Sequence, residues 1–149
     1  MSGDLPKPAG GRTVMVSSVA SDAHSWNLVY LQLLIEELGH TVINLGPCVP
    51  DDLLIDECAR LRPDLLVIST VNGHGYQDGM RVVRKLRDLP GLAATPMVIG
   101  GKVGISGGES PERVAALLEA GFDAVFQEGG HAVGAFRDFI GTLTERVAQ

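Results

Sequence analysis

The sequence has few of the features that mark secreted, disulfide-bonded or membrane-spanning chains. It contains only 2 cysteines, Cys48 and Cys58, and they do not form a CxxC pair. No apolar run approaches the ~18 residues that a membrane-spanning helix needs. The opening segment, MSGDLPKPAGGR, lacks the apolar core of a secretion signal, so we expect residues 1–12 to form a flexible tail. These absences predict a cytoplasmic protein with two free thiols, in which Cys58 is a small core residue.

Basic residues are also scarce. The chain has 12 Lys and Arg against 18 Asp and Glu, and its formal net charge is −6. This balance argues against nucleic acid and against an anionic membrane as the main partner. The basic residues Arg81, Arg84, Lys85 and Arg87 have helical spacing, and we expect them to form one solvated helix face. With 45% hydrophobic residues among 149 positions, the chain is expected to form a single domain over residues 13–149.

Five short runs of β-branched and aliphatic residues alternate with patterns typical of helices. The runs are Thr13–Val19, Thr41–Leu45, Asp64–Ser69, Pro96–Gly100 and Asp123–Phe126. Their nearly continuous apolar character is typical of parallel strands that are buried on both faces. The apolar positions of the predicted helices are Leu31, Leu34, Ile35 and Leu38; Leu54, Cys58 and Leu61; Val82, Leu86 and Leu89; Val114, Leu117 and Leu118; and Val133, Phe136 and Ile140.

Strict alternation of strands and helices predicts an α/β fold with right-handed crossovers. We expect a flavodoxin- or Rossmann-like five-stranded parallel sheet in the order 2-1-3-4-5, with helices on both faces. Ligands of such sheets bind beyond the carboxyl ends of the strands. Three of the 4 histidines fall in the loops that leave strands 1, 3, 4 and 5. These loops are Ser21–Asn27, Ser69–Asp78, Gly100–Glu109 and Glu128–His131.

Asp22 and His24 stand one residue apart where the first strand ends. A carboxylate can accept a hydrogen bond from one imidazole nitrogen and direct the other outward, as a general base or a metal ligand. The same pair also suits an N-cap aspartate beside an exposed histidine. No HxH or ExxH spacing brings His74 or His131 into a zinc site built by the protein alone. A metal on His24 would therefore arrive with its other ligands in a cofactor.

Glycines and hydroxyl groups follow the later strands. Ser69 and Thr70 end the third strand, and Gly100-Gly101 and Gly129-Gly130 follow the fourth and fifth. Glycine lets a backbone approach a ligand closely, although each loop alone also suits an ordinary turn. No GxxxxGK[ST] or GxGxxG phosphate motif is present. Three glycine-containing loops at one sheet edge favour a large flat or extended ligand.

Aromatic and polar residues beside these loops have more than one interpretation. Trp26, the only tryptophan, could stack on a ligand, seal a partner interface or pack beneath its loop. We expect Tyr76, Gln77 and Asp78 to lie at the surface.

Together these residues resemble the cobalamin-binding fold of B12-dependent mutases and methyltransferases. That family's pattern is DxHxxG, then SxL or SxV, then GG. This sequence has Asp22-x-His24-x-x-Asn27, Ser69-Thr70-Val71 and Gly100-Gly101 after the expected strands. The resemblance extends from about Thr13 to Ile140, and the chain is similar to the small subunits of glutamate (methylaspartate) mutase. Asn27 replaces the family's glycine; asparagine tolerates the left-handed backbone conformation and can cap a helix.

The resemblance implies that the protein binds adenosylcobalamin. His24 would be the lower axial cobalt ligand in place of the cofactor's dimethylbenzimidazole base, and Asp22 would hydrogen-bond His24. The displaced nucleotide tail would lie against Ser69, Val71 and the glycine loops. The implied cofactor-binding residues are Ser21, Asp22, Ala23, His24, Ser25, Ser69, Thr70, Val71, Gly100, Gly101, Lys102, Val103, Gly104, Ile105, Ser106 and Gly129. No residue of this chain is expected to be catalytic.

The resemblance further implies one subunit of an isomerase. This enzyme would interconvert L-glutamate and 3-methylaspartate by a radical carbon-skeleton rearrangement, with the radical chemistry supplied by the cofactor. Few residues precede the first strand, so we expect a separate barrel-type subunit to bind the substrate and cover the cofactor. The alternative is a free-standing cobalamin-binding or corrinoid-carrier module. A receiver domain is disfavoured, because the third strand ends in Ser69 rather than in an aspartate.

Overall fold

The chain folds into a sheet whose strands alternate with helices along the sequence. The computed structural model describes residues 12–18, 26–70, 75–101, 111–127 and 132–148. Within these residues the strands are β1 (Thr13–Ser17), β2 (Thr41–Asn44), β3 (Leu65–Thr70), β4 (Met97–Gly101) and β5 (Ala124–Gln127). The helices are α1 (Trp26–Glu37), α2 (Asp51–Leu61), α3 (Gly75–Arg87), the short 3₁₀-helix η1 (Pro90–Leu92), α4 (Pro111–Ala120) and α5 (Ala132–Ala148).

The sheet has the order β2-β1-β3-β4-β5, and each neighbouring pair of strands is parallel. This order confirms the predicted flavodoxin-like α/β class. The predicted strands agree with the observed ones to within two residues at each end. The largest difference is in β1, which ends at Ser17, whereas the predicted end, Val19, lies outside the described residues.

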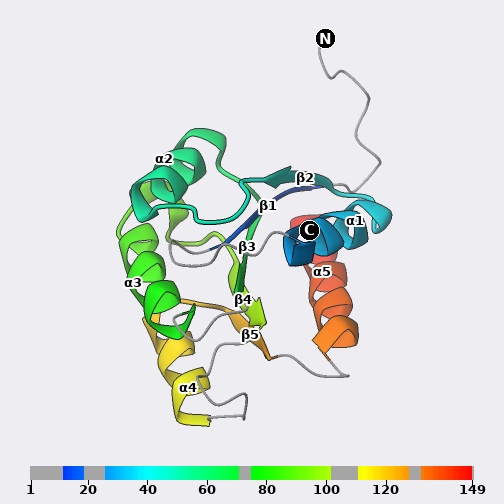
Figure 1. The fold of residues 1–149 in the computed structure, drawn as a ribbon. Helices are drawn as coiled ribbons and strands as arrows, with labels where there is room; N and C mark the ends of the chain where they lie inside the picture. Colours follow the sequence, from blue (N-terminus) through cyan, green and yellow to red (C-terminus); the bar gives the residue numbers. More distant parts are fainter. Residues whose placement is uncertain (1–11, 19–25, 71–74, 102–110, 128–131, 149) are drawn as a thin grey trace.

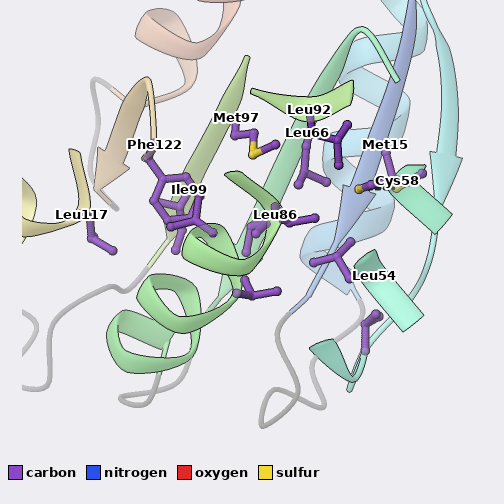
Figure 2. Packing of buried hydrophobic residues seen from close by; sticks show 14 residues of the cluster. Met15, Leu54, Cys58, Leu66, Leu86, Leu92, Met97, Ile99, Leu117 and Phe122 are labelled. Atoms are coloured by element: carbon purple, nitrogen blue, oxygen red, sulfur yellow. Dashed lines mark hydrogen bonds between the residues drawn. The ribbon is translucent and has the colours of Figure 1, made fainter. Parts of the chain in front are cut away.

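Helices cover both faces of the sheet, with α1 and α5 on one side and α2, α3 and α4 on the other (Figure 1). Successive side chains of a strand point to opposite faces, so each strand contributes to two hydrophobic cores. Val14 of β1 lies in the α1–α5 core with Ile35 and Phe136. The next residue, Met15, lies in the core beneath α2, α3 and α4 with Cys58 (Figure 2). The nearly continuous apolar runs of the strands result from this two-sided burial.

Both cysteines are free thiols, as predicted. Cys58 is fully buried, and its sulfur lies 3.6 Å from the sulfur of Met15 (Figure 2). Burial raises the pKa of the Cys58 thiol to about 12. Cys58 is therefore an unreactive core residue, whereas Cys48 is exposed.

Local signals account for several helix ends. Gly39 follows α1 with a φ of +97°, and Gly121 follows α4 with a φ of +140°. Pro111 is the first residue of α4, where its missing N–H costs no hydrogen bond. Two residues of the predicted apolar stripes are exposed instead: Leu38 by 37%, because α1 ends before it, and Leu118 by 43%.

The prediction of a solvated basic face on α3 is wrong for Arg87. Its side chain is only 19% exposed. The guanidinium donates from Nε to the carbonyl oxygen of Gly121 at 2.9 Å and from Nη1 to that of Thr95 at 2.7 Å. It also donates from Nη2 to Oδ2 of Asp123 at 2.9 Å. Arg87 therefore joins the end of α3 to the turn before β4 and to the start of β5.

The prediction that Asp78 lies at the surface is also wrong, because this residue is only 9% exposed. Arg81 donates to Oδ1 of Asp78 at 2.8 Å and, from Nε, to Oδ2 of Asp51 at 2.7 Å. Lys85 adds a third cationic contact, with Nζ 3.0 Å from Asp51. These bonds to Arg81 and Lys85 lower the pKa of the Asp51 carboxyl. The cluster joins the first turn of α2 to α3.

Candidate functional site

Three residues lie side by side in one row at the carboxyl ends of β3, β4 and β5. Two of them, Ser69 and Gly100, are predicted site residues, and the third is Phe126. The strand register pairs Ser69 of β3 with Gly100 of β4, and Gly100 with Phe126 of β5. Earlier residues on the same face, such as Val67 and Val98, belong to the α1–α5 core. The apolar surface of the strands therefore gives way, at the carboxyl edge, to a hydroxyl group and a glycine. This is the edge at which ligands of such sheets bind.

The hydroxyl group of Ser69 has no hydrogen-bond partner among the described residues. The residue as a whole is only 6% exposed, although its oxygen is not among the fully buried, unpartnered side-chain atoms of the described residues. Buried polar groups are nearly always hydrogen-bonded. The hydroxyl can thus satisfy its hydrogen-bonding capacity with a polar atom of a bound ligand.

Gly100 is required by the close approach of β5. A Cβ atom at Gly100 would lie 3.1 Å from the carbonyl oxygen and 3.4 Å from the Cβ atom of Phe126. The ring of Phe126 is held edge-on by Phe136 and Phe139, with ring centroids 5.5 Å and 6.0 Å away. Because Phe126 is fixed in this way, a larger residue at position 100 would have to displace neighbours. The row thus places a hydroxyl group without a described partner beside a glycine and the apolar side chain of Phe126.

The structure describes only part of the predicted site. It includes Ser69, Thr70, Gly100 and Gly101 at the strand ends. The remaining predicted cofactor-binding residues, including His24, lie outside the described residues; they are Ser21, Asp22, Ala23, His24, Ser25, Val71, Lys102, Val103, Gly104, Ile105, Ser106 and Gly129. The axial ligand and its carboxylate partner therefore stay predictions.

Two of the predicted loops are shorter than the sequence indicated. Helix α1 begins at Trp26, so Asn27 is its second residue, in the right-handed helical conformation. A left-handed backbone at Asn27 is therefore not needed where the family has glycine. Helix α3 begins at Gly75, which leaves only residues 71–74 between β3 and α3.

The fourth histidine, His40, lies at the opposite edge of the sheet and is only 6% exposed. The backbone N–H of Arg12 donates to its Nδ1 at 3.0 Å. Burial lowers the pKa of His40, and the charge of Arg12 lowers it further, against the opposing charge of Asp64. His40 therefore stabilises the start of β1 through this hydrogen bond and is not part of the candidate site. No sequence pattern marks His40, because its partner is a backbone group.

Within the described residues, no group of three or more His, Cys, Asp or Glu side chains could hold a metal ion. None of the helices in the same residues has the length and apolar character that crossing a membrane takes.

The sequence pattern of the B12 binding domain matches residues 12–137. The chain therefore belongs to the B12-binding domain family. The glutamate mutase sigma subunit of Halobacterium salinarum is 31% identical over 123 residues, which cover 81% of each chain. The glutamate mutase sigma subunit of Fusobacterium nucleatum is 25% identical over 118 residues, or 79% of this chain and 86% of that protein.

Solved structures show the likeness of the fold alone. The monomethylamine corrinoid protein of Methanosarcina barkeri superposes with a TM-score of 0.68 at 18% identity, covering 89% of this chain and 58% of that one. A receiver domain from a Francisella response regulator superposes equally well, with a TM-score of 0.70 at 18% identity over 92% and 99% of the two chains. Backbone shape therefore does not separate these classes, whereas the sequence matches do.

Proposed function

We propose that the chain is the cobalamin-binding subunit of an adenosylcobalamin-dependent glutamate (methylaspartate) mutase and acts with a separate substrate-binding subunit. The observation that carries the proposal is its match to glutamate mutase sigma subunits along most of both chains, within the B12-binding domain family. The position of Ser69 supports the proposal, because its hydroxyl has no described partner and lies beside Gly100 at the edge where ligands of such sheets bind.

Each part of the edge has a distinct role in this proposal. His24 would bind the cobalt, and Asp22 would accept a hydrogen bond from its other ring nitrogen, which would keep the imidazole oriented. Ser69 would donate a hydrogen bond to a polar group of the nucleotide tail. Gly100 would lie along that tail. Bound adenosylcobalamin supplies the radical chemistry of its cobalt–carbon bond, and this chain contributes binding and orientation.

Electron paramagnetic resonance of the cob(II)alamin complex tests the axial ligand. In protein labelled with nitrogen-15 at histidine, a protein imidazole on cobalt changes the three-line nitrogen splitting to two lines. We expect two lines in the wild type, and loss of that pattern in His24→Ala. The matched controls His74→Ala and His131→Ala should keep it. A three-line pattern in the labelled wild type would show that the cofactor retains its own base, contrary to the proposal.

Activity separates the mutase subunit from a corrinoid carrier. The chain is mixed with adenosylcobalamin and with the substrate-binding subunit of a glutamate mutase from the same organism. Conversion of glutamate to 3-methylaspartate, followed by NMR, is the expected result. Histidine-ligated cobalamin without turnover would instead identify a carrier.

A further inference from the structure

Helix α1 is apolar on the side that faces away from the sheet as well as on the side that packs against it. Its inward residues Leu28 and Ile35 are buried in the α1–α5 core. The outward residues Val29, Tyr30 and Leu33 are exposed by 51%, 46% and 60%. They stand at i, i+1 and i+4 and so lie on one face. A helix that is apolar all round is normally buried, and this helix is covered on one side only.

The charges of α1 are also unusual. Glu36 and Glu37 form its last turn, which contains no basic residue. The last carbonyl groups of a helix carry a partial negative charge, so acids are unfavourable there and cations are favourable. Helices α2 and α3 of the same chain follow this rule, with Arg60 and with Arg84, Lys85 and Arg87 in their last turns. Helix α1 breaks it.

The two acids are not neutralised within the described part of the chain. No ion pair involves Glu36 or Glu37 there, and the only hydrogen bond of the Glu36 side chain comes from Gln32 at 3.3 Å. The outward face of α1 thus combines exposed apolar side chains with an uncompensated negative end. Departures from local rules of this kind concentrate at functional surfaces.

We propose that this face, formed by Val29, Tyr30 and Leu33 with Glu36 and Glu37 at its end, binds a separate protein whose apolar contact surface is bordered by lysine or arginine. A second copy of this chain fits less well, because it would bring another net charge of −6 and no basic residue on its own α1.

The position of α1 indicates which separate protein this is. The helix starts at Trp26, directly after residues 21–25, which contain the proposed axial ligand. Its 12 residues extend about 18 Å from the carboxyl edge of the sheet, at about 1.5 Å per residue. A subunit that covers the cofactor at this edge and extends along α1 would reach the outward face. We infer that the partner is the substrate-binding mutase subunit; this identification rests on the proposed function.

A single substitution with a matched control tests the surface. The affinity of the adenosylcobalamin-loaded chain for the substrate-binding subunit of a glutamate mutase from the same organism is measured by isothermal titration calorimetry. Leu33→Asp places a charge in the middle of the face, and we expect its Kd to rise at least tenfold. Leu118→Asp alters another exposed leucine, 43% exposed near the end of α4 on the other face of the sheet, and should leave the Kd unchanged. Unchanged affinity in Leu33→Asp would overturn the proposal.

The double variant Glu36→Lys/Glu37→Lys tests the charges without touching the apolar residues. We expect weaker binding and a smaller loss of affinity with added salt than in the wild type. No binding by the wild type, or a wild-type dimer in sedimentation that Leu33→Asp dissociates, would also refute this assignment of the partner. The histidine splitting of cob(II)alamin is recorded for each variant. If only the proposed docking surface is wrong, the splitting stays intact in every variant. If the proposed cobalamin binding is wrong, the splitting is missing from the wild type as well.

Discussion

Replacing Ser69 with alanine is expected to affect the free protein and its cofactor complex in opposite directions. Ser69 is only 6% exposed and its hydroxyl makes no hydrogen bond to a described group, so the free protein bears part of the cost of desolvating it. The full cost is about 1–3 kcal/mol from mutational data, and the part borne here is recovered when the group is removed. We expect Ser69→Ala to keep or raise the free energy of unfolding, by up to about 1 kcal/mol. Cobalamin affinity should fall about fivefold, the equivalent of one hydrogen bond of about 1 kcal/mol.

Ser17 provides the matched control for Ser69. It is also a buried serine near the end of a strand, but its hydroxyl donates to the carbonyl oxygen of Ser18 at 2.9 Å. Ser17→Ala should therefore destabilise the free protein by about 1 kcal/mol. Urea unfolding of the free protein gives the two stabilities, and an absorbance titration with cobalamin gives the two affinities.

Either measurement can refute the role assigned to Ser69. If Ser69→Ala destabilises the free protein as much as Ser17→Ala does, the Ser69 hydroxyl has a partner in the protein. If stability is kept but cobalamin affinity is also unchanged, the hydroxyl does not contact the cofactor, and the proposed place of the nucleotide tail is wrong.

Three further changes probe the scaffold. Arg87→Met should lower the free energy of unfolding by about 3 kcal/mol, because several part-buried hydrogen bonds are lost at about 1 kcal/mol each; unfolding in urea measures it. Gly121→Ala should cost about 2 kcal/mol in the same assay, since φ is +140° and the new Cβ would lie 2.8 Å from Cγ of Arg87. The lowered pKa of His40 favours its neutral form in the folded state. The contribution of His40 to stability should therefore be fully present above the unfolded pKa of 6.5 and should decline as pH falls below it. His40→Gln should reduce this decline, and melting temperatures measured at several pH values would show it.

The sequence was sufficient to predict the sheet order and most strand boundaries. Two-sided burial gives parallel strands a pattern that is visible without partners, as in the run from Leu65 to Ile68. The sequence also predicted that Ser69 and Gly100 belong to one site, because both end neighbouring strands of the predicted order. Their pairing across the sheet, and the approach of Phe126, required the observed register.

Other features could not be predicted, for physical reasons. Arg87 was assigned to a solvated face because helical spacing says nothing about backbone carbonyl groups, which are several of its acceptors. His40 accepts a hydrogen bond from the backbone of Arg12, 28 positions away, and leaves no pattern in the sequence. Asp78 seemed to belong to a loop because the glycines before it obscured the start of α3.

The bonds at the amino edge of the sheet determine where anything attached before residue 12 leaves the molecule. Thr41 donates its backbone N–H to the carbonyl oxygen of Arg12 at 2.9 Å, and Asp64 donates to that of Thr13 at 2.8 Å. The start of β1 is thus bonded to both neighbouring strands, at the edge opposite Ser69 and Gly100. A fluorophore, affinity tag or surface linkage joined there would be separated from the ligand-facing edge by the length of a strand. Tethering through that terminus should therefore leave cobalamin free to approach.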